Sequence, residues 1–175
     1  MKFTILLKNV DDSSAPLIVS QIERTGPLNA ATLGLTLAES KSLLSRVQEE
    51  LVESQFQEYV QEQRACSQYG TFRTLKDYHI AHFKSLFGGV SLRVPRLNGC
   101  SCEGQDNRTQ TARIDGLVNW VSPELEFVLS KLAAMIPYAR TADLLELLLP
   151  VDAGNAPSTS QQQREISGQL RSALP

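Results

Sequence analysis

The fold is decided by residues 36–64, which read TLAESKSLLSRVQEELVESQFQEYVQEQR. Thr36 and Glu39 have the spacing of a capping box, in which each side chain accepts a hydrogen bond from a backbone N–H group at a helix start. Apolar residues then recur every three or four positions as far as Val60, between runs of Glu and Gln. This period is typical of an amphipathic helix, so the sequence predicts one long helix that ends near Arg64.

Upstream of this helix the sequence predicts a β-hairpin. Two apolar-rich segments, residues 2–9 and 17–24, flank the turn-prone stretch DDSSAP at positions 11–16. Alternation of apolar segments with a cluster of Asp, Ser and Pro is typical of two strands joined by a turn.

Downstream of residue 64 the pattern changes to short alternating segments, which predict a β module. Strands are expected at 72–75, 78–87 and 90–94, with Gly88-Gly89 as a two-residue turn, because glycine accepts positive φ angles. That turn would place Lys84 opposite Arg93. Like charges directly opposed are unfavourable unless an anion lies over them. Residues 104–110 are expected to form a polar loop.

The last third of the chain predicts helices. Ser122-Pro123-Glu124 combines a cap, a proline at the first helical position and an acid near the positive end of the dipole. A second helix is expected from Thr141 to Pro150, and a polar helix within residues 161–173. These helices could form a helix-turn-helix, or their leucines could simply be core. The predicted fold class is α+β, with parts at 1–64, 65–113 and 114–175.

Composition excludes several protein classes. The 42% hydrophobic and 21% charged residues argue against wholesale disorder. No apolar run approaches the roughly 20 residues that cross a bilayer. The first ten residues lack the features of a signal peptide. We therefore expect a cytoplasmic protein without a membrane partner.

The charge is distributed unevenly along the chain, although its net value is only −2. Residues 66–113 contain seven basic and three acidic residues, hence +4, whereas both flanking parts are negative. A local positive field attracts a polyanion whatever the overall sum. The candidate DNA-binding residues, which we expect to contact phosphates, are Arg73, Lys76, Lys84, Arg93 and Arg96, with Tyr78 and Phe83 interleaved. The alternative is the solvated face of a small sheet.

Three cysteines suit a reduced compartment and raise the possibility of a metal site. Cys66 and the pair Cys100 and Cys102 could form two corners of a structural zinc site, with His79 or His82 as the fourth ligand. His79 is the preferred candidate. The alternative is a zinc-ribbon-like module that has lost its metal and keeps packed thiols.

No catalytic constellation is found in the sequence. It has no Gly-rich phosphate loop, no nucleophile elbow and no His-Glu-x-x-His helix. Its acids lie mostly at helix-surface positions, where solvated charge is the simplest interpretation. We expect no independent catalysis.

An ordered set of short motifs resembles the N-terminal region of bacterial insertion-sequence transposases of the ISKra type. The first motifs are Thr32–Glu39, Arg64–Cys66, Leu75-Lys76 with His79, Leu86–Gly88, Pro95–Leu97 and Cys100–Cys102. The order continues with Ser122–Leu125, Lys131–Ala133, Pro137-Tyr138 and Leu144–Pro150. The likeness covers roughly residues 30 to 150. Tyr69 stands where the family has a second cysteine, and the tail from Gly154 departs as well.

This resemblance implies a zinc-ribbon-like and helical DNA-binding front, followed in the family by an RNase-H-like domain with a DDE carboxylate triad. That catalytic domain would be expected beyond Pro175, so the chain would be a truncated element or an N-terminal fragment. The implied function is recognition of double-stranded element DNA in transposition, with a nucleoid-associated location. Two alternatives remain: a protein-interaction module that pairs through the long helix, also as a homo-oligomer, and a decayed remnant.

Overall fold

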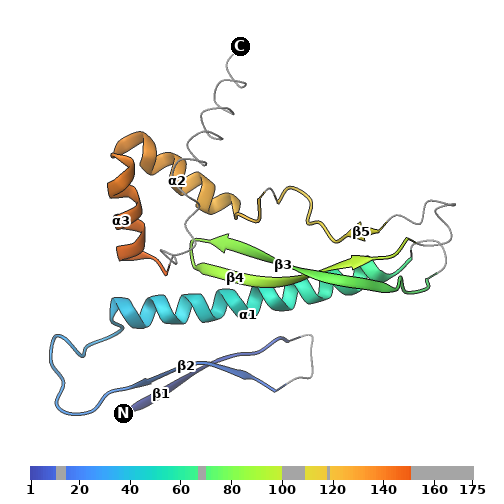
Figure 1. Cartoon of the computed structure of the whole chain (residues 1–175). Coiled ribbons are helices and arrows are strands. Elements are labelled where there is room, and N and C mark those ends of the chain that lie inside the picture. The colour runs from blue at the N-terminus through green and yellow to red at the C-terminus, as the bar shows by residue number, and fades with distance from the viewer. Residues whose placement is uncertain (11–14, 67–69, 100–108, 118, 151–175) are drawn as a thin grey trace.

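The computed structural model of the 175-residue chain describes residues 1–10, 15–66, 70–99, 109–117 and 119–150. It has the α+β composition that the sequence predicts (Figure 1). The elements are β1 (Lys2–Leu7), β2 (Leu17–Glu23), α1 (Leu37–Arg64), β3 (Leu75–Ser85), β4 (Gly88–Leu97), β5 (Gln110–Thr111), α2 (Pro123–Met135) and α3 (Tyr138–Leu148).

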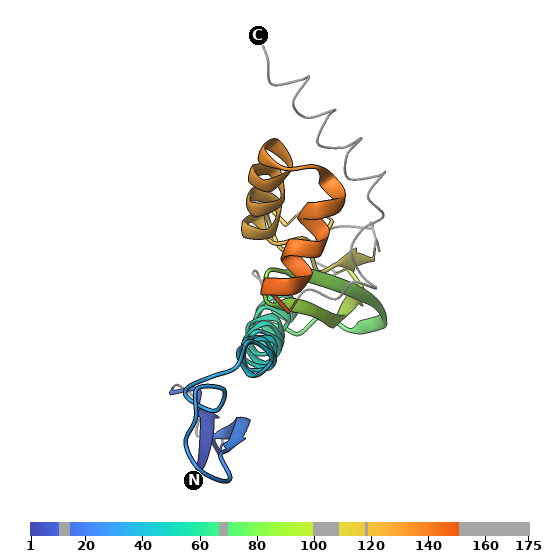
Figure 2. The same cartoon turned by 90° about the vertical axis from the view of Figure 1, so that its left-hand side faces the viewer.

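The long helix α1 is the centre of the molecule. The β1–β2 hairpin lies on one side of it, and the β3–β4–β5 sheet with α2 and α3 lies on the other (Figures 1 and 2). The predicted capping box is confirmed: Glu39 N donates to Thr36 Oγ1 at 3.2 Å and Thr36 N donates to Glu39 Oε2 at 2.8 Å. The helix ends at Arg64, as expected.

An arginine that follows β2 forms an ion pair with the first turn of α1. Arg24 donates two hydrogen bonds to the Glu39 carboxylate, at 2.6 and 2.7 Å. The guanidinium, together with the hydrogen bonds from Thr36, lowers the pKa of Glu39 from 4.5 to about 2. The same carboxylate therefore caps α1 and holds the end of β2 beside it.

The N-terminal hairpin is confirmed, but it buries little. β1 and β2 pair antiparallel, with a register shift between Ile5 and Leu6. Val19 and Ile22 are its buried residues, and β2 packs against α1. Exposed apolar side chains remain on both strands, at Phe3, Leu6, Leu17 and Ile18.

The β module is a three-stranded sheet of order β3-β4-β5, and its turn lies elsewhere than expected. Ser85 pairs with Gly88, so the turn residues are Leu86 and Phe87, and the two glycines belong to β4. Lys84 is consequently opposite Gly89, and Arg93 is opposite Ile80. The expected Lys84–Arg93 pair is therefore wrong. The strand predicted at 72–75 is also replaced, by a single bridge between Ala65 and Phe72.

Close approach explains why glycine is needed at position 88. The Ser85 hydroxyl closes the turn by donating to Gly88 O at 2.9 Å and accepting from Phe87 N at 3.1 Å. Gly88 has a φ of +116°, and a Cβ there would lie 3.0 Å from Ser45 Oγ of α1 and 3.4 Å from Pro150 O. The turn tip thus contacts α1 and the end of the helical part at one point.

The core forms where α1 packs against β4. Its buried residues are Phe56, Val60, Ala81, Val90, Leu92, Val94 and Ala112. Trp120 adds its ring edge-on to Phe56, with centroids 6.1 Å apart. Asn119 and Trp120 both adopt positive φ angles, which are uncommon for residues other than glycine. This conformation lets Trp120 O accept from Lys84 N at 2.7 Å, so residues 120–122 follow the free edge of β3.

The first predicted helix of the C-terminal part is confirmed, and the second begins earlier than expected. Ser122 caps α2, its hydroxyl accepting from Leu125 N at 3.2 Å, and Pro123 is the first helical residue. α3 begins at Tyr138 rather than Thr141 and ends before Pro150. The predicted helix within 161–173 lies outside the described residues. Among the described helices, none has the length and apolar character needed to span a membrane.

Candidate nucleic-acid interface

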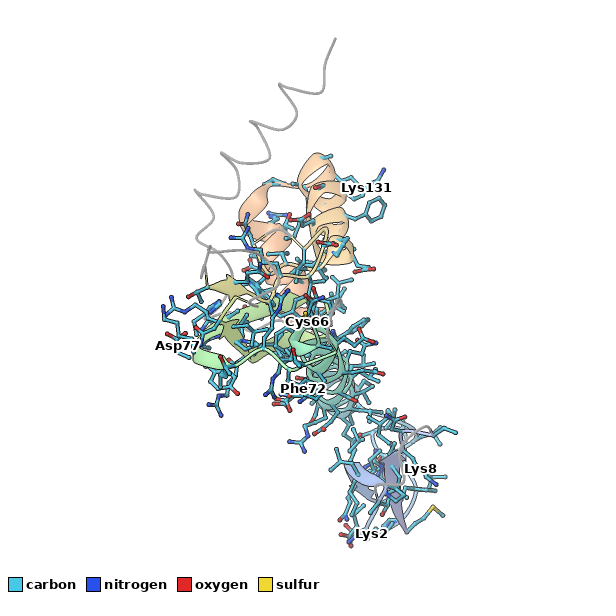
Figure 3. The ribbon with its side chains drawn as sticks, turned by 90° about the vertical axis from the view of Figure 1, so that its right-hand side faces the viewer. Lys2, Lys8, Cys66, Phe72, Asp77 and Lys131 are labelled. Carbon is cyan, nitrogen blue, oxygen red and sulfur yellow. The ribbon has the colours of Figure 1, made fainter. Side chains whose placement is uncertain are left out.

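The two faces of the β3–β4 hairpin have different polar residues. On one face Asp77 pairs with Arg96 and His79 with Val94; on the other Tyr78 pairs with Pro95 and Ile80 with Arg93. α1 contacts β4 most, and its residues line one pocket with Tyr78 and Arg93 and another with Phe83 and Leu92, so it borders both faces of the hairpin. Cys66 lies where α1 meets the β module, and Asp77 lies at the outer side of the sheet (Figure 3).

Arg96 is neutralised by a carboxylate. Its Nε and Nη2 donate to the two oxygens of Asp77 in a bidentate ion pair. The guanidinium lowers the pKa of Asp77, so this acid is ionised at neutral pH. The charge of Arg96, one of the five candidate DNA-binding residues, is therefore already matched within the fold.

Arg93 lies on the opposite face and is supported by an aromatic ring. Its guanidinium carbon is 4.6 Å from the centroid of the Tyr78 ring, within the range of cation–π attraction. Both residues are exposed. Tyr78 thus positions Arg93 without cancelling its charge.

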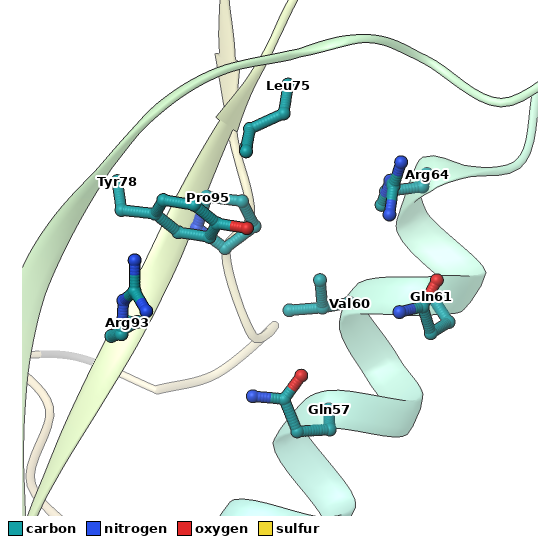
Figure 4. A pocket seen from close by; sticks show the side chains of 8 residues that line it. All are labelled: Gln57, Val60, Gln61, Arg64, Leu75, Tyr78, Arg93 and Pro95. Carbon is teal, nitrogen blue, oxygen red and sulfur yellow. The ribbon is translucent and has the colours of Figure 1, made fainter.

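A pocket of about 220 Å³ lies between this face and the last turns of α1 (Figure 4). Eight residues line it: Gln57, Val60, Gln61, Arg64, Leu75, Tyr78, Arg93 and Pro95. In Figure 4 the polar side chains of α1 lie on one wall, and Arg93 and Tyr78 lie on the opposite wall.

The chemistry of this lining favours an anion. Its charged groups are the guanidinium groups of Arg64 and Arg93, and its neutral polar groups can all donate hydrogen bonds. None of the described residues of the lining is a carboxylate. The Nε atom of Arg64 is buried and has no hydrogen-bond partner among the described residues.

Lys84 lies on the same face as Arg93, four residues nearer the turn than Ile80, the partner of Arg93. It is half-buried. Within the described part of the chain no carboxylate forms an ion pair with Arg64, Lys84 or Arg93. We call the residues Arg64, Tyr78, Lys84 and Arg93 the Arg93 surface.

The other two predicted residues gather at the far end of the sheet, near β5. Arg73 Nη1 donates to Gln110 Oε1 at 2.5 Å, and Lys76 Nζ donates to Thr109 Oγ1 at 3.2 Å. The five predicted basic residues therefore form no single strip. They divide between the Arg93 surface, the β5 end and the Asp77 pair.

The predicted metal ligands are only partly described. Cys66 is buried, and His79 is exposed on β3, whereas Cys100 and Cys102 lie outside the described residues. His79 and His82 lie on opposite faces of β3, as the strand period requires, and His82 Nδ1 is 3.0 Å from Ser91 Oγ. The described residues contain no group of three potential metal ligands.

Sequence reasoning missed the contribution of α1 to this site. Gln57, Gln61 and Arg64 follow one another at spacings of four and three residues, which places them on one helix face. Their proximity to the core residue Val60 was a usable signal, because polar residues beside a buried position border a packed neighbour. The sequence of the helix does not indicate, however, that Arg93 is this neighbour.

Comparison of the chain with protein-family models, curated proteins and solved structures finds no match. What the Arg93 surface binds must therefore be inferred from its own residues.

Proposed function

We propose that this chain binds double-stranded DNA through the Arg93 surface, with a backbone phosphate held between Arg64 and Arg93. Guanidinium groups bind phosphate oxygens with charge-assisted, often bidentate hydrogen bonds. Gln57 and Gln61 add neutral donors on the helix side of the pocket. Lys84 extends the contact along the hairpin toward the next phosphates.

The observation that carries this proposal is the convergence of Arg64 and Arg93 in a pocket that, in the part of the chain the structure describes, is lined without a carboxylate. Structural arginines are usually matched by an acid, as Arg24 and Arg96 are in this molecule. The two pocket arginines instead lie near aromatic rings: Arg93 over Tyr78, and Arg64 at 5.8 Å from the ring centroid of Phe72. Their charges remain available to a ligand.

Phosphate contacts of this kind position DNA but do not read its sequence. In the interpretation as the recognition part of a transposase, base readout would come from the helical part, with α2 and α3 as the first helices of a helix-turn-helix. Thr141 and Leu145 of α3 are buried, consistent with packing of these helices against each other. The β module would be a zinc ribbon held by Cys66, Cys100, Cys102 and His79. Determining zinc in the purified chain, before and after replacing Cys100 and Cys102 by Ser, tests that ligand set.

Binding is tested by fluorescence anisotropy with a labelled DNA duplex. If Arg64, Lys84 and Arg93 each contribute one phosphate contact, affinity should fall about 40-fold between roughly 50 and 200 mM salt. The Arg93→Ala chain should bind about tenfold more weakly, since it loses one charge-assisted contact.

The matched control is Arg46→Ala. Arg46 is an exposed arginine of α1, 4.0 Å from Glu49 and outside the pocket lining, so its removal changes the net charge equally. Equal loss of affinity in both variants would reduce the binding to a general charge effect. No binding by the unmodified chain at low salt would refute the proposal.

A second candidate function is protein interaction through α1, and a specific observation favours it. Leu37, Leu44 and Leu51 are apolar but exposed along this helix. A chain that associates with a partner and has no DNA affinity at low salt would support this candidate against the first.

A further inference from the structure

The pocket between α1 and the β3–β4 hairpin contains more positive charge than one internal DNA phosphate can neutralise. Arg64 and Arg93 each bring a full positive charge to its lining. Each internal phosphate of DNA carries a single negative charge. With one such phosphate between the two guanidinium groups, one of the two positive charges would have no counterpart.

The acids of α1 lie outside this pocket. Glu58 and Glu62 directly follow Gln57 and Gln61 of the lining, so they are turned by about 100° from them around the helix. Glu53 lies one turn before Gln57 and is not a lining residue. Over the described ranges of the chain, no ion pair joins these acids to either arginine of the pocket. The pocket therefore leaves the second charge to be balanced by its ligand.

A terminal phosphate matches the pocket in charge and in hydrogen bonds. As a phosphomonoester it carries a charge of about −1.5 to −2 at pH 7 and has three strong acceptor oxygens, whereas an internal phosphodiester has two free oxygens. Arg64 and Arg93 can each donate two parallel hydrogen bonds, and Gln57, Gln61 and Tyr78 add further donors. Three oxygens match donors on two opposite walls better than two oxygens do (Figure 4).

The walls of the pocket favour the same ligand. The pocket has a volume of about 220 Å³, with α1 on one side and the hairpin on the other (Figure 4). An internal phosphate is ester-linked to two sugars, and both sugars have to leave the space between these walls. A terminal phosphate has one ester link, so it can enter with its three free oxygens foremost.

We infer that this pocket binds the terminal phosphate of a DNA strand in preference to an internal phosphate. The inference rests on the proposed function and names the part of the DNA that the pocket binds best, which is a phosphorylated strand end. An internal phosphate still binds, but it matches only one of the two charges.

The preference is tested with short duplexes of identical sequence that carry a fluorescent label at an internal base. Their strand ends bear either hydroxyl groups or phosphates, at the 5′ ends in one duplex and at the 3′ ends in another. Anisotropy titrations of the full chain near pH 7.5 should show about tenfold tighter binding to a phosphorylated duplex, because one more charge-assisted contact is made.

Two arginine variants show whether the pocket causes the preference. Arg93→Ala leaves one guanidinium group in the pocket, so the preference for the phosphorylated duplex should disappear. Arg46→Ala removes an exposed arginine outside the lining and should keep it. A preference that both variants keep would be a general effect of the added phosphate charge and would contradict the inference.

The pH dependence of the preference gives a second readout. The second pKa of a phosphomonoester is about 6, so below this pH the terminal phosphate carries one charge, like a diester. The affinity ratio of the two duplexes should therefore shrink as the pH falls from about 7.5 to about 5. Protonation of His82, on the same face of the hairpin as Arg93, acts on both duplexes and cancels in the ratio.

The pocket chemistry is also tested without DNA, by NMR titration with methyl phosphate and with dimethyl phosphate. The resonances of Gln57 and Tyr78 should reach saturation at lower concentrations of methyl phosphate, the monoester. Equal affinity for the two esters, or for the phosphorylated and unphosphorylated duplexes, would overturn this inference and leave the proposed function in place. Absence of binding to every duplex at low salt would refute the proposed function and this inference with it.

Discussion

The two faces of the β3–β4 hairpin use arginine in opposite ways. On one face Arg96 is held by both oxygens of Asp77, and on the other Arg93 lies 4.6 Å from the centre of the Tyr78 ring. The carboxylate cancels the charge it positions, whereas the ring positions the charge and leaves it intact. Two arginines three residues apart in sequence therefore have different capacities to bind an anion.

This difference shows that a count of basic residues is a poor guide to a binding surface. Residues 66–113 carry a net +4, but the charge of Arg96 is already paired with Asp77 in this fold. Under the proposed function, Arg64, which lies outside the basic segment, would contribute more, because α1 brings it across the pocket from Arg93.

Removing both pocket arginines should have the largest effect. The Arg64→Ala/Arg93→Ala chain loses two charge-assisted contacts and is expected to bind DNA roughly 100-fold more weakly. Anisotropy titrations at low salt measure this loss. The Arg46→Ala/Arg140→Ala chain removes two exposed arginines elsewhere and should lose far less affinity. Comparable losses in the two double variants would contradict the assignment of DNA binding to Arg64 and Arg93.

Replacing the ring that supports Arg93 should have a smaller effect. Tyr78→Ala leaves the charge but removes its support, so affinity should fall roughly three- to tenfold. Tyr78→Phe keeps the ring and should bind nearly as well as the unmodified chain. Equal losses in both variants would show that the hydroxyl, rather than the ring, is the important group.

Removing the carboxylate that pairs with Arg96 should allow the Asp77 face of the hairpin to bind DNA weakly. Asp77→Asn removes the carboxylate, so DNA affinity should rise about two- to fivefold, in line with the modest strength of an exposed ion pair. The titration is the same as above. Unchanged or weaker binding would indicate that the Asp77 face does not come near the DNA.

The ion pair between Arg24 and Glu39 should affect stability and not binding. Because the folded-state pKa of Glu39 is about 2, below its ordinary 4.5, its stabilising contribution is complete above pH 4.5 and is lost as the pH falls toward 2. The difference in Tm between the unmodified chain and Glu39→Gln should therefore be largest at neutral pH and shrink in acid. A Tm difference that does not vary with pH would show that the charge of Glu39 is not what stabilises the folded chain.

The elements with strong local signals could be predicted from the sequence. Thr36, Glu39, Ser122 and Pro123 mark the helix starts correctly, because capping is decided by residues within one turn. The hairpin turn was misplaced because the glycine pair looked like turn chemistry. Gly88 is instead required by its contact with Ser45 of α1, which is distant in sequence.

The candidate site could be predicted only in part, for the same reason. Arg93 was expected to bind phosphate from its place in a basic segment, but the pairing of Arg96 with Asp77, which distinguishes the two arginines, depends on the strand register. Arg64 joins the site because α1 packs beside β4. A pocket between two elements can be predicted only when the packing of those elements is known. The sequence pattern of α1 or of β4 alone does not indicate that packing.

The most direct test compares Arg93→Ala with Arg96→Ala in DNA titrations over a range of salt concentrations. Each variant loses one arginine from the same strand, so their net charges are equal. We predict that Arg93→Ala lowers the dependence of log affinity on log salt by about one contact, whereas Arg96→Ala leaves affinity and slope nearly unchanged. Equal losses in the two variants, or a larger loss in Arg96→Ala, would contradict the assignment of DNA binding to the Arg93 surface.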